Sequence, residues 1–309
     1  MADPFVLWYD QTYYLYGTSA DDGFRAWKSS NLMDWDTVGY VYRRSEASWA
    51  QDSFWAPEVV YYRGKFYLIF SAKGTAPDGL RICLAVSDSP KGPFRDLHVP
   101  LFDHGFSCID GHLFVDQDQT PYLYYEMVGA VGKPHEEAGY FWGMIFGVQL
   151  SQDLSGLVRD EPQLCVYPTQ DWENPTGTLA RSTEGMTVFQ HDSTYYMTYS
   201  ANHYTDPQYG VGYATAPHPL GPWTKSMVNP ILSQRPELGL SGPGHNGVVC
   251  SPDTQELFIV YHSHADPGAP SVRRMLNVDR LVIDPDGTLR VVGPRRRLYS
   301  PPSGARLPK

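Results

Sequence analysis

Short runs in which apolar and polar residues alternate recur along the whole chain, whereas apolar stripes with the helical period are scarce. Such alternation is typical of strands that bury one face. Five segments share a longer unit, in which an apolar strand and a polar turn precede an aromatic strand, and each predicts a β-hairpin. The five copies are VLWYDQTYYLYGTS, VVYYRGKFYLIFSA, LFVDQDQTPYLYYE, TVFQHDSTYYMTYS and VVCSPDTQELFIVYHS.

The spacing of these hairpins predicts the blades of a propeller. The copies lie too far apart for single hairpins, and strand-like segments such as LRICLAVSDS follow them. We expect one all-β domain over residues 1–309, a five-bladed β-propeller, without strand exchange between the chain ends. Its blades are expected at 3–50, 54–105, 108–167, 182–230 and 243–294. The alternative is a β-sandwich with coincidental alternation.

One position of the repeat carries reactive side chains. The first strand of each hairpin is expected to line the central channel, so the residues that begin it should converge at one mouth of that channel. Clustered like charges are costly unless a function exploits them. The alternative is that each acid caps a loop. In chain order the residues at this position are Asp3, Ala56, Asp110, Glu184 and His245.

Converging carboxylates suit the hydrolysis of a glycosidic bond. One carboxyl group must hold a proton and donate it to the leaving oxygen, while another, ionised, activates water. A third can raise the pKa of the proton donor through its negative charge.

The chain resembles glycoside hydrolase family 43 over nearly its whole length. The resemblance rests on ADPFV, SFWAPEVVYYRGKFYLIFSA, IDGHLFVD, TEGMTVF and GPGHNGVV. It implies that Asp3 is the general base, that Asp110 orients the acid and modulates its pKa, and that Glu184 is the general acid. It also implies inversion of the anomeric carbon in one displacement.

The same resemblance implies that His245 faces an ion or a water cluster in the channel, often calcium (Ca2+). Calcium prefers oxygen ligands, so waters would have to complete the coordination shell around a single histidine. The alternative is that His245 hydrogen-bonds to the acids without a metal.

Four residues of the second and fifth copies are candidates for sugar binding. Trp55 could stack on the apolar face of a sugar ring, and Ala56 leaves space beside it. Glu58 alternates to the same strand face as Ala56 and could bind substrate or serve the scaffold. Arg274 corresponds, by the resemblance, to an arginine that contacts the sugar or the catalytic acids.

Two insertions interrupt the repeat, around residues 129–143 and 168–182. Long loops on a rigid scaffold often carry specificity, so Trp142 and Trp172 are expected to wall one end of the pocket. A pocket closed at one end would favour exo action. The alternative role of these loops is a contact between copies in a homo-oligomer.

Charge and composition narrow the partners. The net charge of −10, from 24 basic and 34 acidic residues, disfavours nucleic acid and anionic membranes. The four cysteines form no C-x-x-C pair, so a zinc or redox motif is not indicated. The sequence shows no signal-peptide pattern and no apolar run of bilayer length, which predicts a cytoplasmic protein.

Together with the resemblance, these observations predict a glycosidase, a β-xylosidase or α-L-arabinofuranosidase. It would act from chain ends on β-1,4-xylo-oligosaccharides, on terminal α-L-arabinofuranosyl groups of plant cell-wall polysaccharides, or on both. An endo- or exo-acting arabinanase is the second candidate. A non-catalytic, carbohydrate-binding propeller is the candidate from another class.

Overall fold

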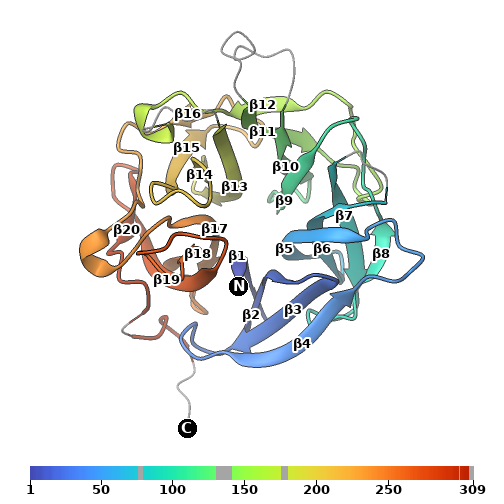
Figure 1. Ribbon diagram of the computed structural model, residues 1–309, viewed down its shortest axis with the longest axis horizontal. Coiled ribbons are helices and arrows are strands. Elements are labelled where there is room, and N and C mark those ends of the chain that lie inside the picture. The colour runs from blue at the N-terminus through green and yellow to red at the C-terminus, as the bar shows by residue number, and fades with distance from the viewer. Residues whose placement is uncertain (76–78, 130–140, 175–179, 299, 306–309) are drawn as a thin grey trace.

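The computed structural model describes residues 1–75, 79–129, 141–174, 180–298 and 300–305. Its strands are grouped around a central axis, and the N-terminal strand lies next to that axis (Figure 1). Within the described residues, helical structure is confined to two short 3-10 turns, η2 (Asp171–Glu173) and η3 (Pro236–Leu238). No helix in this part of the chain is long and apolar enough to cross a membrane.

The described strands form successive antiparallel meanders of four strands each, in chain order. The first contains β1 (Ala2–Tyr9), β2 (Thr12–Ala20), β3 (Gly23–Ser29) and β4 (Asp36–Arg43). The second contains β5 (Asp52–Tyr62), β6 (Lys65–Lys73), β7 (Leu80–Ser87) and β8 (Arg95–His98). The third contains β9 (Cys108–Val115), β10 (Pro121–Val128), β11 (Phe141–Gln149) and β12 (Gln163–Val166). The fourth contains β13 (Ala180–His191), β14 (Thr194–Ala201), β15 (Gly210–Ala216) and β16 (Thr224–Lys225). The last contains β17 (Gly244–Cys250), β18 (Leu257–His264), β19 (Arg274–Ile283) and β20 (Leu289–Val292).

The third and fourth meanders are joined by hydrogen bonds. The start of β11 pairs in parallel with the start of β13, which makes one eight-stranded sheet. The hairpin repeat did not predict this pairing, because it lies outside the repeated hairpins. The hydrogen-bonded sheets of the described residues are therefore four, although the meanders follow the five predicted hairpins.

Hydrophobic clusters fill every contact between neighbouring meanders. One cluster joins the first and second through rings such as Phe24, Phe54 and Phe70. Another joins the first and last, where Leu15 packs with Phe258. The remaining contacts, from second to third, third to fourth and fourth to last, have clusters of their own. Each meander thus buries apolar side chains on both faces, which it could not do alone.

The first and last sheets meet without exchanging strands. The first sheet is built from strands of residues 2–43 and the last from strands of residues 244–292. The amino group of Met1 donates a hydrogen bond of 3.3 Å to the carbonyl oxygen of Arg274. This contact places the first strand beside the last sheet.

Candidate active site

A pocket of about 300 Å³ opens where the first strands of the meanders converge. The structure brings together there the three predicted carboxylates, the predicted histidine, one predicted tryptophan and the predicted arginine. The lining residues are Asp3, Trp55, Ile109, Asp110, Glu184, Tyr204, His245, Val272 and Arg274.

A β-bulge in the first strand of every meander positions the pocket side chains that this strand carries. At the bulge, one residue adopts a left-handed backbone, which residues other than glycine rarely do. Such strained positions concentrate at functional sites. The residues and their φ angles are Asp3 (51°), Ala56 (45°), Asp110 (57°), Gly185 (53°) and His245 (45°).

The bulges correct one prediction. Glu184 does not share the position of Asp3 and Asp110; Gly185 does, and Glu184 precedes it. By strand register, Glu184 corresponds to Trp55 and to other residues just before a bulge. The general-acid candidate therefore enters the pocket from a different backbone position. Sequence spacing missed this because hairpin turns of unequal length hide a shift of one residue.

Asp3 lies 8% exposed among cationic and hydrogen-bonding groups. Its Oδ1 is 3.2 Å from Arg274 Nη1 and 3.5 Å from His245 Nδ1. Its Oδ2 accepts a hydrogen bond of 2.6 Å from the Thr18 hydroxyl. Burial alone would raise the pKa of Asp3, but His245 and Arg274 hold that pKa well below its usual range. Asp3 is therefore ionised, as a general base must be.

Glu184 is half-buried and has the opposite tendency. Burial, and next the charge of Asp110, raise the pKa of Glu184 to about 7. Tyr209 Oη donates a hydrogen bond of 2.5 Å to Glu184 Oε1, which opposes this rise. A carboxyl group with this pKa can carry a proton at neutral pH, as a general acid must.

Asp110 connects the other two carboxylates. Burial raises the pKa of Asp110 to about 6, with the nearby charge of His245 opposing and that of Asp3 adding to the rise. Its Oδ2 accepts a hydrogen bond of 3.2 Å from the Gly185 backbone N–H. The negative charge of Asp110 in turn raises the pKa of Glu184 and so favours the protonated form of Glu184.

His245 faces the carboxylates. Its Nδ1 lies 3.5 Å from Asp3 Oδ1 and 3.6 Å from Asp110 Oδ2. Although burial disfavours the charged ring, the charges of Asp110 and Asp3 raise the pKa of His245. At these distances the contacts are ion pairs rather than hydrogen bonds.

A divalent ion fits this cluster poorly. Ligand atoms of Asp110, Glu184 and His245 lie within 4.8 Å of one another. Calcium, however, prefers six to eight oxygens, and a Glu184 that holds a proton would be a weak ligand. The calcium predicted at His245 stays a prediction.

The predicted sugar-binding residues of the second meander have different surroundings. Trp55 is 42% exposed and lines the pocket, as stacking on a sugar would require. Ala56 is buried, and its N–H donates a hydrogen bond to Thr18 Oγ1. Glu58 binds His112 Nδ1 through its Oε2 at 2.7 Å and does not line the pocket. The sequence left open whether Glu58 binds substrate or supports the scaffold, and its contact with His112 favours support of the scaffold.

Arg274 contacts two residues of the pocket. Besides its contact with Asp3, its guanidinium lies 4.8 Å from the centre of the Tyr204 ring. Both side chains line the pocket. Stacking on the ring fixes the guanidinium that neutralises Asp3.

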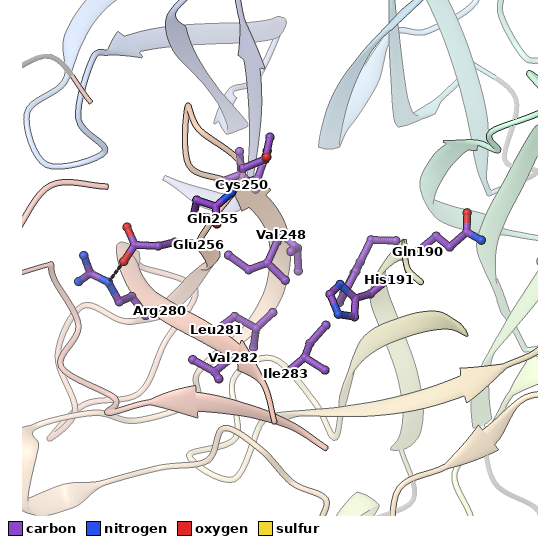
Figure 2. A pocket seen from close by; sticks show the side chains of 14 residues that line it. Gln190, His191, Val248, Cys250, Gln255, Glu256, Arg280, Leu281, Val282 and Ile283 are labelled. Carbon is purple, nitrogen blue, oxygen red and sulfur yellow. Dashed lines mark hydrogen bonds and ion pairs between the residues drawn. The ribbon is translucent and has the colours of Figure 1, made fainter. Parts of the chain in front are cut away.

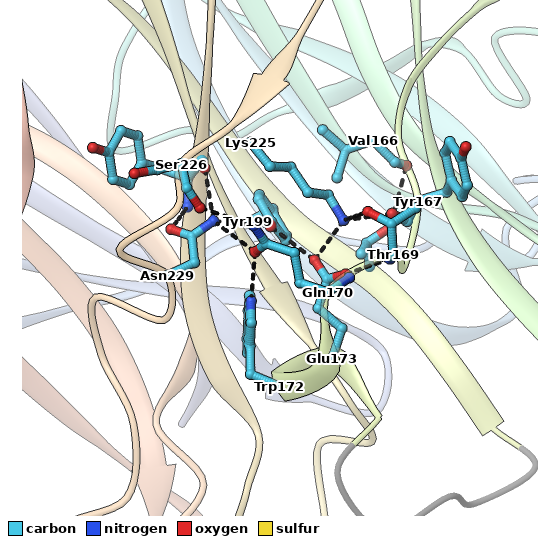
Figure 3. Close-up of polar contacts among 12 residues, drawn as sticks. Val166, Tyr167, Thr169, Gln170, Trp172, Glu173, Tyr199, Lys225, Ser226 and Asn229 are labelled. Carbon is cyan, nitrogen blue, oxygen red and sulfur yellow. Dashed lines mark hydrogen bonds and ion pairs between the residues drawn. The ribbon is translucent and has the colours of Figure 1, made fainter.

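Trp172 was expected to wall the pocket, and this prediction is wrong. It lies in η2, where its ring packs 6.0 Å from that of Tyr199 and its Nε1 donates to Gln170 Oε1 (Figure 3). A Cβ atom at Gly212 would come within 2.6 Å of this indole, so the glycine makes room for it. The ring therefore lines a separate cavity near η2. The Trp142 side chain lies outside the described part of the chain.

The turn η2 is held by a buried ion pair. Glu173 accepts hydrogen bonds from Lys225 Nζ at 2.5 Å and from the Tyr199 hydroxyl at 2.8 Å (Figure 3). Its carboxylate also accepts the backbone N–H groups of Thr169 and Gln170. This network fixes the segment before β13 to the fourth meander.

A further cavity, of about 470 Å³, lies between the far ends of β13 and β17 (Figure 2). Its lining is largely apolar, with Val248, Leu281 and Ile283 among the side chains. Its lining carboxylate, Glu256, is paired with Arg280 at 2.7 Å. The cavity lacks a second carboxylate in its described lining, so it does not suit glycoside hydrolysis.

Sequence reasoning missed the residues that support the carboxylates. Tyr209 binds Glu184, Thr18 binds Asp3, and His262 accepts the Asp3 N–H through its Nδ1 at 3.1 Å. Thr18 follows Tyr14 by four residues and His262 follows Phe258 by four residues, so the two occupy the same place in their hairpins. That spacing was an available signal. Tyr209 lies outside the repeated hairpins, so the repeat contained no signal for it.

Comparisons with known proteins identify the family of the chain. The family described as "Glycosyl hydrolases family 43" matches residues 1–289. A crystal structure of a thermostable family-43 glycoside hydrolase superposes with a TM-score of 0.91 and 45% identity, covering 97% of this chain and 95% of that one. A β-D-galactofuranosidase, xynD, of Aspergillus niger is 27% identical over 93% of this chain and 81% of its own length. A xylosidase/arabinosidase of Bacteroides ovatus is 26% identical over 94% of both chains. The carboxylate pocket and these likenesses together show that the chain belongs to glycosyl hydrolase family 43.

Proposed function

We propose that this glycoside hydrolase removes terminal β-xylosyl or α-L-arabinofuranosyl units from xylo- or arabino-oligosaccharides. The observation that carries the proposal is the convergence of Asp3, Asp110 and Glu184 in one small pocket. The opposed pKa shifts of Asp3 and Glu184 support it. A volume of about 300 Å³ is at the lower end of small-molecule sites, which favours a terminal unit over a long chain. The Bacteroides relative's name, xylosidase/arabinosidase, supports the same sugars.

In the proposed reaction, Asp3 accepts a proton from a water molecule. The water oxygen bonds to the anomeric carbon while the bond from that carbon to the leaving oxygen breaks. Before the reaction, the negative charge of Asp110 raises the pKa of Glu184 and so keeps Glu184 protonated. Glu184 then donates this proton to the leaving oxygen. One displacement of this kind inverts the anomeric carbon. Proton NMR of the first-formed sugar would identify its anomer, and retention would rule out this mechanism.

The fold proposal is a five-bladed β-propeller. The five meanders and the hydrophobic cluster at each of their mutual contacts support it. In such a propeller, the third and fourth meanders are separate blades, and the short β11–β13 pairing connects them.

Two substrates separate the acid from the base. A nitrophenyl glycoside has an acidic leaving group that needs little protonation, whereas xylobiose needs a general acid. Glu184→Gln should lose about 100-fold or more on xylobiose and much less on nitrophenyl xyloside or arabinofuranoside. Asp3→Asn should lose both activities alike, because both need an activated water. Absence of any wild-type hydrolysis would instead favour a carbohydrate-binding protein.

Product analysis addresses the mode of action. Xylo- and arabino-oligosaccharides should release single sugars from one end. Internal cleavage of arabinan into oligosaccharides would favour the arabinanase alternative.

A further inference from the structure

A buried carboxyl group on β10, Glu126, has no part in the mechanism above. The residue is 2% exposed. Its Oε1 accepts a hydrogen bond of 2.5 Å from the Ser182 hydroxyl, but its Oε2 is buried without a hydrogen-bond partner. A buried polar atom without a partner is costly, so its presence calls for an explanation.

Glu126 occupies a position that the other meanders use differently. In strand register it pairs with Ile109, just before a bulge. The residues in the same register elsewhere are Thr18, Ser71, Ser200 and His262. Each of these four accepts the bulge N–H of the following meander, at 2.9, 2.9, 2.7 and 3.1 Å, respectively. We call this hydrogen bond from the bulge the inter-sheet latch.

The latch is broken only at Glu126 among these five described positions. The next bulge N–H, that of Gly185, donates to Asp110 Oδ2 at 3.2 Å instead. Glu126 has turned to Ser182, which lies on the same strand as Glu184 and two residues before it. Asp110 is thereby tied directly to the residue that follows Glu184.

Gly143 leaves space for the Glu126 side chain to turn toward Ser182. A Cβ atom at Gly143 would lie 1.6 Å from Glu126 Oε1 and 2.0 Å from Ser182 Oγ. Any larger residue there would displace the pair. The glycine and the glutamate therefore fit together as one local arrangement.

The surroundings favour a protonated Glu126. Burial first, then the charges of Glu184 on β13 and Asp110 on β9, raise the pKa of Glu126 well above its usual range. Ser182 and Gly143, which also pack against it, bring no charge. A neutral carboxyl group can accept the Ser182 hydrogen bond without adding a negative charge next to Asp110 and Glu184.

We propose that Glu126 is a positioning residue for the Asp110–Glu184 pair. Because Glu126 accepts the hydrogen bond from Ser182, it does not accept the Gly185 N–H, which donates to Asp110 instead. This hydrogen bond fixes the Asp110 carboxylate, whose charge keeps Glu184 protonated. The inference rests on the proposed hydrolytic function.

The test restores the latch. Glu126→Ser introduces the hydroxyl that the second and fourth meanders already carry at this position, so the variant is expected to fold. The new hydroxyl should capture the Gly185 N–H. Asp110 then loses a hydrogen bond that favours its ionised form, and its pKa rises. We expect kcat on the disaccharide cleaved by the wild type to fall about tenfold or more, and the acid limb of kcat/KM to move to higher pH.

Three variants separate this role from simple damage. Glu126→Gln keeps the shape and the neutral hydrogen-bonding groups, so it should retain a kcat and pH profile close to wild type. Ser182→Ala releases Glu126 from its partner and should move the acid limb in the same direction as Glu126→Ser. Glu173→Gln, which changes another buried carboxyl group outside the pocket, should lower stability and leave the pH profile unchanged.

Wild-type kinetics and pH dependence in Glu126→Ser would overturn the inference, as would a Glu126→Gln variant damaged as severely as Glu126→Ser. A shifted profile in Glu173→Gln would also overturn it, because the shift would then report loosened packing. Failure of the proposed function itself looks different, since the wild-type protein would then cleave neither disaccharides nor nitrophenyl glycosides.

Discussion

Tyr209 Oη donates a hydrogen bond of 2.5 Å to Glu184 Oε1, and the tyrosine is fully buried. The tyrosine ring stacks on His262, which in turn accepts the Asp3 N–H. A continuous set of contacts therefore links the proposed acid to the strand that carries the proposed base.

Replacing Tyr209 by phenylalanine should shift the alkaline limb of the pH–rate profile. The tyrosine hydroxyl stabilises ionised Glu184, so its loss raises the pKa of Glu184. The alkaline limb of kcat/KM should then move to higher pH, and kcat should fall about tenfold because Glu184 is less well oriented. An unchanged alkaline limb would mean that Glu184 is not the group that must be protonated.

The wild-type enzyme should show a narrow bell-shaped pH profile. Activity falls at low pH as Asp110 gains a proton near its pKa of about 6. It falls at high pH as Glu184 loses its proton near its pKa of about 7. The optimum should lie between these values, although the two limbs belong to the coupled pair. Initial rates across the pH range check this, and Asp110→Asn should lose the acid limb.

Arg274→Met should lower kcat/KM by about 10- to 100-fold. The substitution removes the guanidinium that neutralises Asp3 and stacks on Tyr204. Arg274→Lys keeps the charge but loses the planar stacking, so an intermediate rate is expected. Arg273→Met is the matched control, because the neighbouring Arg273 is exposed and absent from the pocket lining. Equal effects at both positions would contradict a specific role for Arg274.

Lys225→Met should destabilise the protein by about 3–5 kcal/mol, since it leaves the buried Glu173 carboxylate without its cation. Adding Glu173→Gln to this variant should recover part of the loss, because the unpaired charge is then removed. Urea unfolding of the two single variants and the double variant measures the coupling. Additive losses would show that the ion pair does not act as a unit.

Treatment with a chelator should leave the rate unchanged, because the pocket cluster offers few oxygen ligands and includes a carboxyl group that holds a proton. The rate is compared before chelation, after it, and after calcium is added back. A loss that calcium restores, and that His245→Ala abolishes, would instead establish the calcium site expected from the sequence.

The sequence alone determined the family and the composition of the site. Alternation and recurring aromatic hairpins indicated all-β structure, and the repeat predicted that Asp3, Asp110, Glu184 and His245 converge at one pocket. These features are visible because hairpin periodicity and the motif residues are local along the chain.

Only the tertiary structure decided how these groups are tuned. The bulge offset that separates Glu184 from Asp3 and Asp110 depends on strand register. The pKa values depend on burial and on partners distant in the chain, such as Tyr209 for Glu184. The position of Trp172 was predicted wrongly for a similar reason, because Gly212 on β15 makes room for its ring. Local pattern therefore specified which groups are present, while contacts across sheets specified their orientation and charge.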